Sequence, residues 1–74
     1  MTLTLLVDDV VVALDEGRPR EMGGVRLQFD RLSGGDILRV RNDSPRPVVI
    51  VPPAILCRRQ IHVAPPGFYL SFSF

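Results

Sequence analysis

Apolar and polar residues alternate along much of this chain, most regularly where Val25, Leu27 and Phe29 are separated by polar or charged residues. A period of two is typical of a strand with one buried face, so these three side chains are predicted to point inward. After turn-forming residues at 33–36, Leu38 and Val40 alternate with Arg39 and Arg41 in the same way. The two segments are therefore predicted to pair as an antiparallel hairpin with one solvent-exposed face.

The last seven residues alternate again. Their three phenylalanines and one leucine fall on one side of an extended chain, opposite Tyr69 and two serines, which predicts a structural closing strand. We expect this apolar side to join the core or to continue it across an interface with another chain. The residues predicted for this role are Phe68, Leu70, Phe72 and Phe74, together with Val25, Leu27, Phe29, Leu38 and Val40 of the hairpin.

Short apolar runs between turn-forming residues predict further strands at 2–7, 10–14, 48–51 and 60–63, with turns or loops at 8–9, 18–24, 42–47 and 64–67. The run 48–51 is continuously apolar, as in strands covered on both faces. Residues 54–59 fit either one helical turn or a short edge segment. Residues 1–74 are thus predicted to form a single all-β domain, a small antiparallel β-sandwich or barrel of six to seven short strands.

Two stretches of the chain, Gly35–Ser44 and Ala64–Tyr69, resemble the strand-turn and closing-strand segments of cupredoxin-type sandwiches. The resemblance covers under half of the chain and implies a β-sandwich topology. Cupredoxins hold copper with two His, a Cys and often a Met around the closing turn. This chain has one His and no such ligand in Phe68–Phe74, so neither copper nor another cofactor is predicted.

The chain has only 74 residues, and a domain of this size buries only about 60% of the surface that its unfolded form exposes. Small folds usually need a disulfide, a metal or a partner subunit. An intrachain disulfide is excluded because Cys57 is the only cysteine, and Cys57 with His62 gives too few ligands for structural zinc. A homo-oligomer or a protein partner is therefore expected, and whether Cys57 is free or pairs with another chain is left open.

The candidates for catalysis are few. Cys57 and His62 are the one possible nucleophile and base, but five residues of separation place them on opposite faces of a strand. The acidic pairs at 8–9 and 15–16 and the glycine pairs at 23–24 and 34–35 are interpreted as turn residues. We therefore expect neither catalytic nor metal-binding residues and no small-molecule substrate.

All nine basic residues are arginines, and eight acidic residues reduce the net charge to +1. Arg26, Arg39 and Arg41 are predicted to share the solvent face of the hairpin, and Arg58 and Arg59 to extend it. Arginine forms forked, weakly hydrated contacts suited to protein interfaces. The five arginines are therefore predicted to supply polar contacts to a protein partner, and nucleic acid is the alternative ligand of this face.

These observations predict a non-enzymatic structural or interaction protein that assembles with itself or docks on a larger complex. Size and architecture suggest, by analogy, an accessory component of a phage or virus particle, such as a decoration, collar or tail piece. The alternative is a small nucleic-acid-binding β-barrel with an arginine-lined face. No apolar run reaches the length of a membrane helix and no signal peptide is apparent, so virion or cytoplasm is the expected location.

Overall fold

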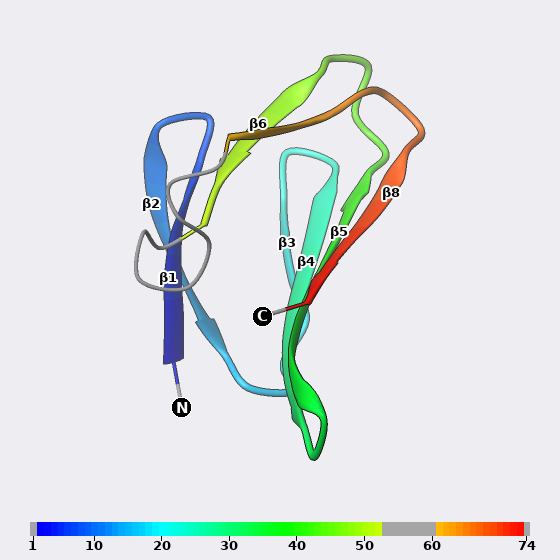
Figure 1. Ribbon diagram of the computed structural model, residues 1–74. Coiled ribbons are helices and arrows are strands. Elements are labelled where there is room, and N and C mark those ends of the chain that lie inside the picture. The colour runs from blue at the N-terminus through cyan, green and yellow to red at the C-terminus, as the bar shows by residue number, and fades with distance from the viewer. Residues whose placement is uncertain (1, 53–60, 74) are drawn as a thin grey trace.

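The computed structural model describes residues 2–52 and 61–73 as two four-stranded antiparallel sheets packed into a sandwich (Figure 1). The strand order is β2-β1-β6-β7 in one sheet and β3-β4-β5-β8 in the other. The predicted all-β sandwich is confirmed, while Cys57, Arg58, Arg59, Phe74 and the open choice at 54–59 lie outside the described residues. The strands are β1 (Thr2–Val7), β2 (Val10–Asp15), β3 (Arg20–Met22), β4 (Val25–Leu32), β5 (Gly35–Asn42), β6 (Val48–Val51), β7 (His62–Ala64) and β8 (Tyr69–Ser73).

The predicted central hairpin is confirmed as β4 and β5, which pair from Val25 opposite Asn42 to Leu32 opposite Gly35. Its alternating apolar side chains point between the sheets because a strand places every second residue on the same face. They meet the inward side chains of β1, β2 and β6 in one core. The buried apolar cluster comprises Leu3, Leu5, Val7, Val12, Leu14, Val25, Leu27, Phe29, Leu38, Val40, Val48 and Ile50.

The turn between β1 and β2 consists of Asp8 and Asp9, both with positive φ, at 48° and 66°. Two-residue turns of this hand match the twist of a hairpin, although aspartate adopts them less readily than glycine or asparagine. Asp8 is held there by β6, since its amide donates to the Val49 carbonyl and its Oδ1 accepts from the Val49 amide, both at 2.9 Å. The predicted turn thus also joins the first hairpin to β6.

Two expectations need correction. Residues 18–24 are not a continuous loop, because Arg20–Met22 forms β3 and pairs with β4 through the Gly23–Gly24 turn. Both glycines have positive φ, which a two-residue hairpin turn requires, and three residues are too few to show a periodic pattern. Residues 2–52 and 61–73 therefore form eight strands, more than the predicted six to seven. β6 is not covered on both faces either, since Val49 is 36% exposed.

The closing strand β8 pairs with β5 at the edge of its sheet, shown in red in Figure 1. Leu70 and Phe72 are half-buried against the core and Tyr69 is exposed, as the alternation predicts. Phe68 precedes the strand and is 56% exposed, so it does not join the core. The reason is a turn immediately before it, in which the Phe68 amide donates to the Pro65 carbonyl.

Asn42, at the end of β5, is the one fully buried polar side chain among the described residues, with zero exposure. Its Nδ2 donates to the carbonyls of Arg46 at 2.7 Å and Ala64 at 2.8 Å. Its Oδ1 accepts from the Ser44 amide at 2.9 Å and the Ser44 hydroxyl at 2.5 Å. The amide thus uses both donors and both acceptor sites, which removes the cost of burying it.

The main chain of Asn42 makes two further bonds to the turn before β8. Its amide donates to the Phe68 carbonyl at 3.0 Å, and its carbonyl accepts from the Gly67 amide at 2.7 Å. Next to it, the Asp43 amide donates to the Gly24 carbonyl at 2.8 Å. The residue read in the sequence as the start of a strand-breaking loop is therefore the point at which three loops join.

We predict that Asn42→Ala lowers the free energy of unfolding by about 3 kcal/mol, because it leaves the Arg46 and Ala64 carbonyls and the Ser44 amide without their partner. Urea unfolding monitored by circular dichroism measures the change in the free energy of unfolding. Asp43→Ala is the matched control, because its exposed carboxylate contacts only the exposed Arg41 and should matter little. Equal stability of the two variants would contradict the role of Asn42.

Candidate functional site

The outer faces of the two sheets differ in chemistry. In the β2-β1-β6-β7 sheet, Val11, Leu6 and Val51 lie side by side on the outer face in consecutive register. The strand sequences of this sheet contain one charged residue, Asp15, apart from the titratable His62 at the start of β7. This face is consequently largely apolar, with Thr2, Thr4 and Asp15 as its exposed polar residues, while the arginines of the sandwich strands lie in the other sheet.

The outer face of the β3-β4-β5-β8 sheet brings together the three predicted arginines that the structure describes. Arg26 on β4 lies directly opposite Arg41 on β5, and Arg41 lies opposite Tyr69 on β8. Gln28 and Arg39 form the next cross-strand pair. These five side chains line a hollow of about 190 Å³, which we call the arginine hollow.

Arg39 is neutralised inside the arginine hollow. Its Nη1 donates to Asp30 Oδ2 at 2.6 Å, and both side chains are partly shielded from solvent. Gln28 Nε2 also donates to the Asp30 carboxylate, at 3.2 and 3.3 Å. A short, charge-assisted bond of this kind holds Arg39 in place and cancels its charge.

Arg26 and Arg41 keep most of their positive charge. Arg41 Nε contacts Asp43 at 3.2 Å, but both side chains are more than half exposed, so water screens the pair. Glu21 lies opposite Arg26 on β3. Within residues 2–52 and 61–73, however, no carboxylate lies within ion-pair distance of the Arg26 guanidinium. The hollow therefore presents two adjacent guanidinium groups beside an exposed aromatic ring.

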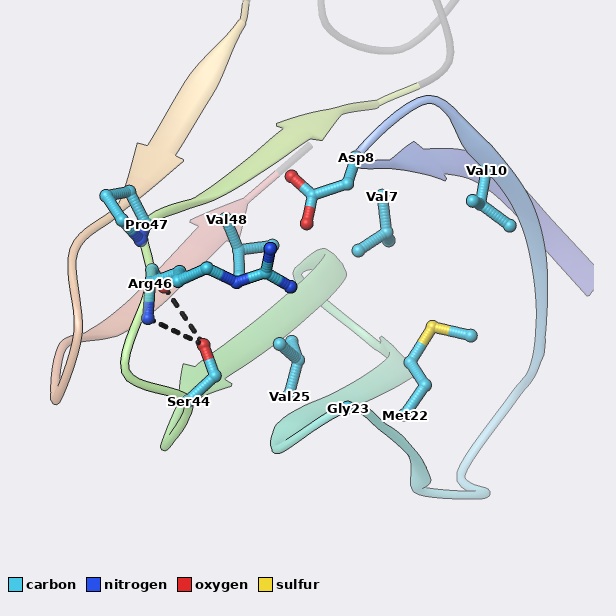
Figure 2. A pocket seen from close by; sticks show the side chains of 10 residues that line it. All are labelled: Val7, Asp8, Val10, Met22, Gly23, Val25, Ser44, Arg46, Pro47 and Val48. Atoms are coloured by element: carbon cyan, nitrogen blue, oxygen red, sulfur yellow. Dashed lines mark hydrogen bonds between the residues drawn. The ribbon is translucent and has the colours of Figure 1, made fainter.

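A second hollow, of about 250 Å³, opens at the end of the sandwich where the β1–β2 and β3–β4 turns approach the 44–48 segment (Figure 2). Its floor includes Val7, Val25 and Val48, and the side chains of Asp8 and Arg46 point toward each other across it. The Asp8 carboxylate already accepts the Val49 amide. Among the described lining residues, no nucleophile is hydrogen-bonded to a base, so we assign no catalytic residues to this hollow.

The four edge strands are protected unequally. The edges β3 and β7 have only three residues each. The edge β2 is longer, but Arg20 Nη1 donates to the Ala13 carbonyl at 3.0 Å and so occupies an outward-facing acceptor. β8 has five residues and contains neither proline nor charge, the two usual protections of an edge. It is the most open edge of the described sandwich.

Cys57, which with His62 is not expected from the sequence to be catalytic, lies outside the described residues. His62 is half-buried, and its ring lies against Phe72 of β8 with centroids 4.2 Å apart. In the part of the chain that the structure describes, no cluster of three or more His, Cys, Asp or Glu side chains could hold a metal ion. No helix long and apolar enough to span a membrane occurs among these residues.

Comparisons of the chain with known protein families, characterised proteins and solved structures gave no significant match. Inference about function therefore depends on the open edge and the arginine hollow. Sequence alternation placed Arg26, Arg39 and Arg41 on one face, but it did not show that Tyr69 lies beside them. Arg41 and Tyr69 are 28 positions apart in the chain, and the pairing of β5 with β8 brings them together.

We predict that Arg20→Gln increases association through β2, because it weakens the charge-assisted bond to the Ala13 carbonyl and uncovers that edge. The free energy of unfolding should fall by about 1 kcal/mol or less, since the contact is exposed. Sedimentation equilibrium measures the mass as a function of concentration. Arg18→Gln is the control, because it removes the same charge from the loop before β3. An equal increase in mass for the Arg18→Gln variant would contradict the prediction.

Proposed function

We propose that this chain is a non-enzymatic interaction module that assembles by pairing the open edge of β8 with a strand of another chain. The observation that carries the proposal is the contrast between β8, which has no charge or proline, and β2, whose edge carbonyl at Ala13 is occupied by Arg20. Strand addition of this kind derives affinity from main-chain hydrogen bonds. It needs no catalytic residues.

The register identifies which groups of β8 are available. Asn42 donates its amide to the Phe68 carbonyl, so the 42–68 pair is hydrogen-bonded between β5 and the start of β8. Hydrogen-bonded and non-bonded pairs alternate in an antiparallel ladder. The main-chain groups of Tyr69, Ser71 and Ser73 therefore point away from β5, toward the open edge.

A second copy of the chain is the partner that we propose first. Two β8 strands related by a two-fold axis would pair antiparallel and join two sheets of four strands across the interface. A small domain buries a smaller fraction of its surface on folding than a large domain does, so it gains more stability from such a partner. Docking on a larger protein would use the same edge, and an accessory role in a phage or virus particle stays a prediction from size and architecture.

We predict that Ser71→Pro weakens self-association at least about tenfold, because it removes an outward amide and places a ring on the shared edge. The ladder to β5 should persist, since the lost amide does not point toward β5. Sedimentation across a dilution series measures the dissociation constant, and circular dichroism checks that the variant is folded. Ser71→Lys tests the same edge by charge and does not constrain the main chain.

Thr4→Lys is the matched control for the edge, because Thr4 is exposed in the middle strand β1 of the apolar face. The proposal expects this variant to associate like the unmodified chain. If Thr4→Lys disrupts association and both Ser71 variants leave it intact, the apolar face rather than the β8 edge is the interface. A folded monomer that persists at high concentration would also contradict the proposal.

A further inference from the structure

We propose that the arginine hollow binds one nucleotide unit, with its phosphate between Arg26 and Arg41 and its base against the Tyr69 ring. The unit is a free nucleotide or part of a single-stranded nucleic acid, and the chemistry recognised is the same in both. This inference does not depend on strand pairing at β8. The proposed partner strand meets the main chain of β8, whereas the hollow lies on the outer face of the sheet.

Two positive side chains lie directly opposite each other at the arginine hollow. Arg26 and Arg41 are cross-strand partners, and like charges in this position repel each other and destabilise a sheet. Arg26 has no ion-pair partner among the described residues, and the Asp43 contact of Arg41 is exposed to solvent. An anion between the two guanidinium groups would replace this repulsion with two charge-assisted interactions.

The planar guanidinium group of arginine suits a phosphate. A guanidinium offers its N–H donors in a planar fork that matches the oxygens of a phosphate. Gln28 and Arg39 lie beside the pair and are held by Asp30, so that side of the hollow is already ordered. A phosphate would consequently meet donors in a cavity that is formed before it binds.

An aromatic ring lies in the same cross-strand row as the two arginines. Tyr69 lies opposite Arg41 on the neighbouring strand, is 56% exposed and lines the hollow. Stacking of a base on an aromatic side chain stabilises binding of single-stranded nucleic acid without sequence preference. A ring beside a phosphate-binding pair therefore distinguishes a nucleotide from a simple inorganic anion.

The acidic residues nearby limit the site to about one unit. Glu21 lies at one end of the row, Asp30 neutralises Arg39, and the net charge of the chain is only +1. A long polyanion would require a continuous positive track. The hollow provides two guanidinium groups, Arg26 with no ion pair among the described residues and Arg41 with a solvent-exposed one, which suit one phosphate and the base attached to it.

The single tyrosine makes the site directly observable, because the chain contains no tryptophan and its intrinsic fluorescence comes from Tyr69 alone. Titration with uridine monophosphate should quench this emission, and inorganic phosphate should bind more weakly because it cannot stack. Backbone amide NMR shifts give an independent readout that does not depend on fluorescence. We expect binding of uridine monophosphate to weaken as salt rises, because salt screens the exposed contacts between the phosphate and the two arginines.

Arg26→Gln and Arg41→Gln should each weaken binding of uridine monophosphate about tenfold, as expected for loss of a charge-assisted contact. Arg31→Gln is the matched control, since it removes the same charge from β4 at a position that does not line the hollow, and should change affinity less than about twofold. Tyr69→Ser, followed by NMR, should reduce the affinity for uridine monophosphate to that for inorganic phosphate.

A ten-nucleotide oligouridine separates the two sources of the ligand. Binding of the oligonucleotide more tightly than ten independent uridine monophosphate units would assign the site to single-stranded nucleic acid, and equal affinity per unit would assign it to free nucleotides. The proposal is overturned if the Arg26→Gln/Arg41→Gln double variant binds uridine monophosphate as well as the unmodified chain does. The same holds if neither probe shifts the amides of the hollow. Both results are independent of the sedimentation behaviour of the Ser71 variants.

Discussion

The buried amide of Asn42 is the constraint on which the arrangement of this sandwich depends. A polar side chain without exposure is tolerated only if every hydrogen-bonding group is satisfied, and Asn42 achieves this with the 44–46 loop and with Ala64 at the end of β7. Those bonds fix how the chain leaves β5 and how it returns toward β8. The core then fills the space between two sheets whose connections are already placed.

Alternation along the chain was sufficient to predict β4, β5 and β8, because each has a more buried and a more exposed face over at least five residues. It could not reveal β3, which has three residues and depends on the glycine turn that pairs it with β4. It could not identify Asn42 either. A polar residue before a proline-rich loop suggests a turn, and only the three-dimensional approach of three loops shows that it is buried.

At the candidate surfaces too, some features follow from the local sequence pattern and others from contacts between distant segments. The arginines on β4 and β5 share a face because of their spacing in the sequence, which local pattern predicts. The position of Tyr69 beside them and the cover that Arg20 gives to Ala13 both arise from segments brought together by the fold. Chemistry that depends on neighbours from different strands therefore becomes visible only when the register is known.

The unequal protection of the two long edges also determines what kind of assembly the fold permits. Because β8 is open and the Ala13 carbonyl of β2 already accepts a bond from Arg20, each molecule offers one long edge for strand pairing rather than two. A body with one such edge forms a closed pair, whereas a body with two can add copies indefinitely into a fibre. In the assembly proposed through β8, the bond from Arg20 to Ala13 would thus favour closed pairs over open-ended fibres.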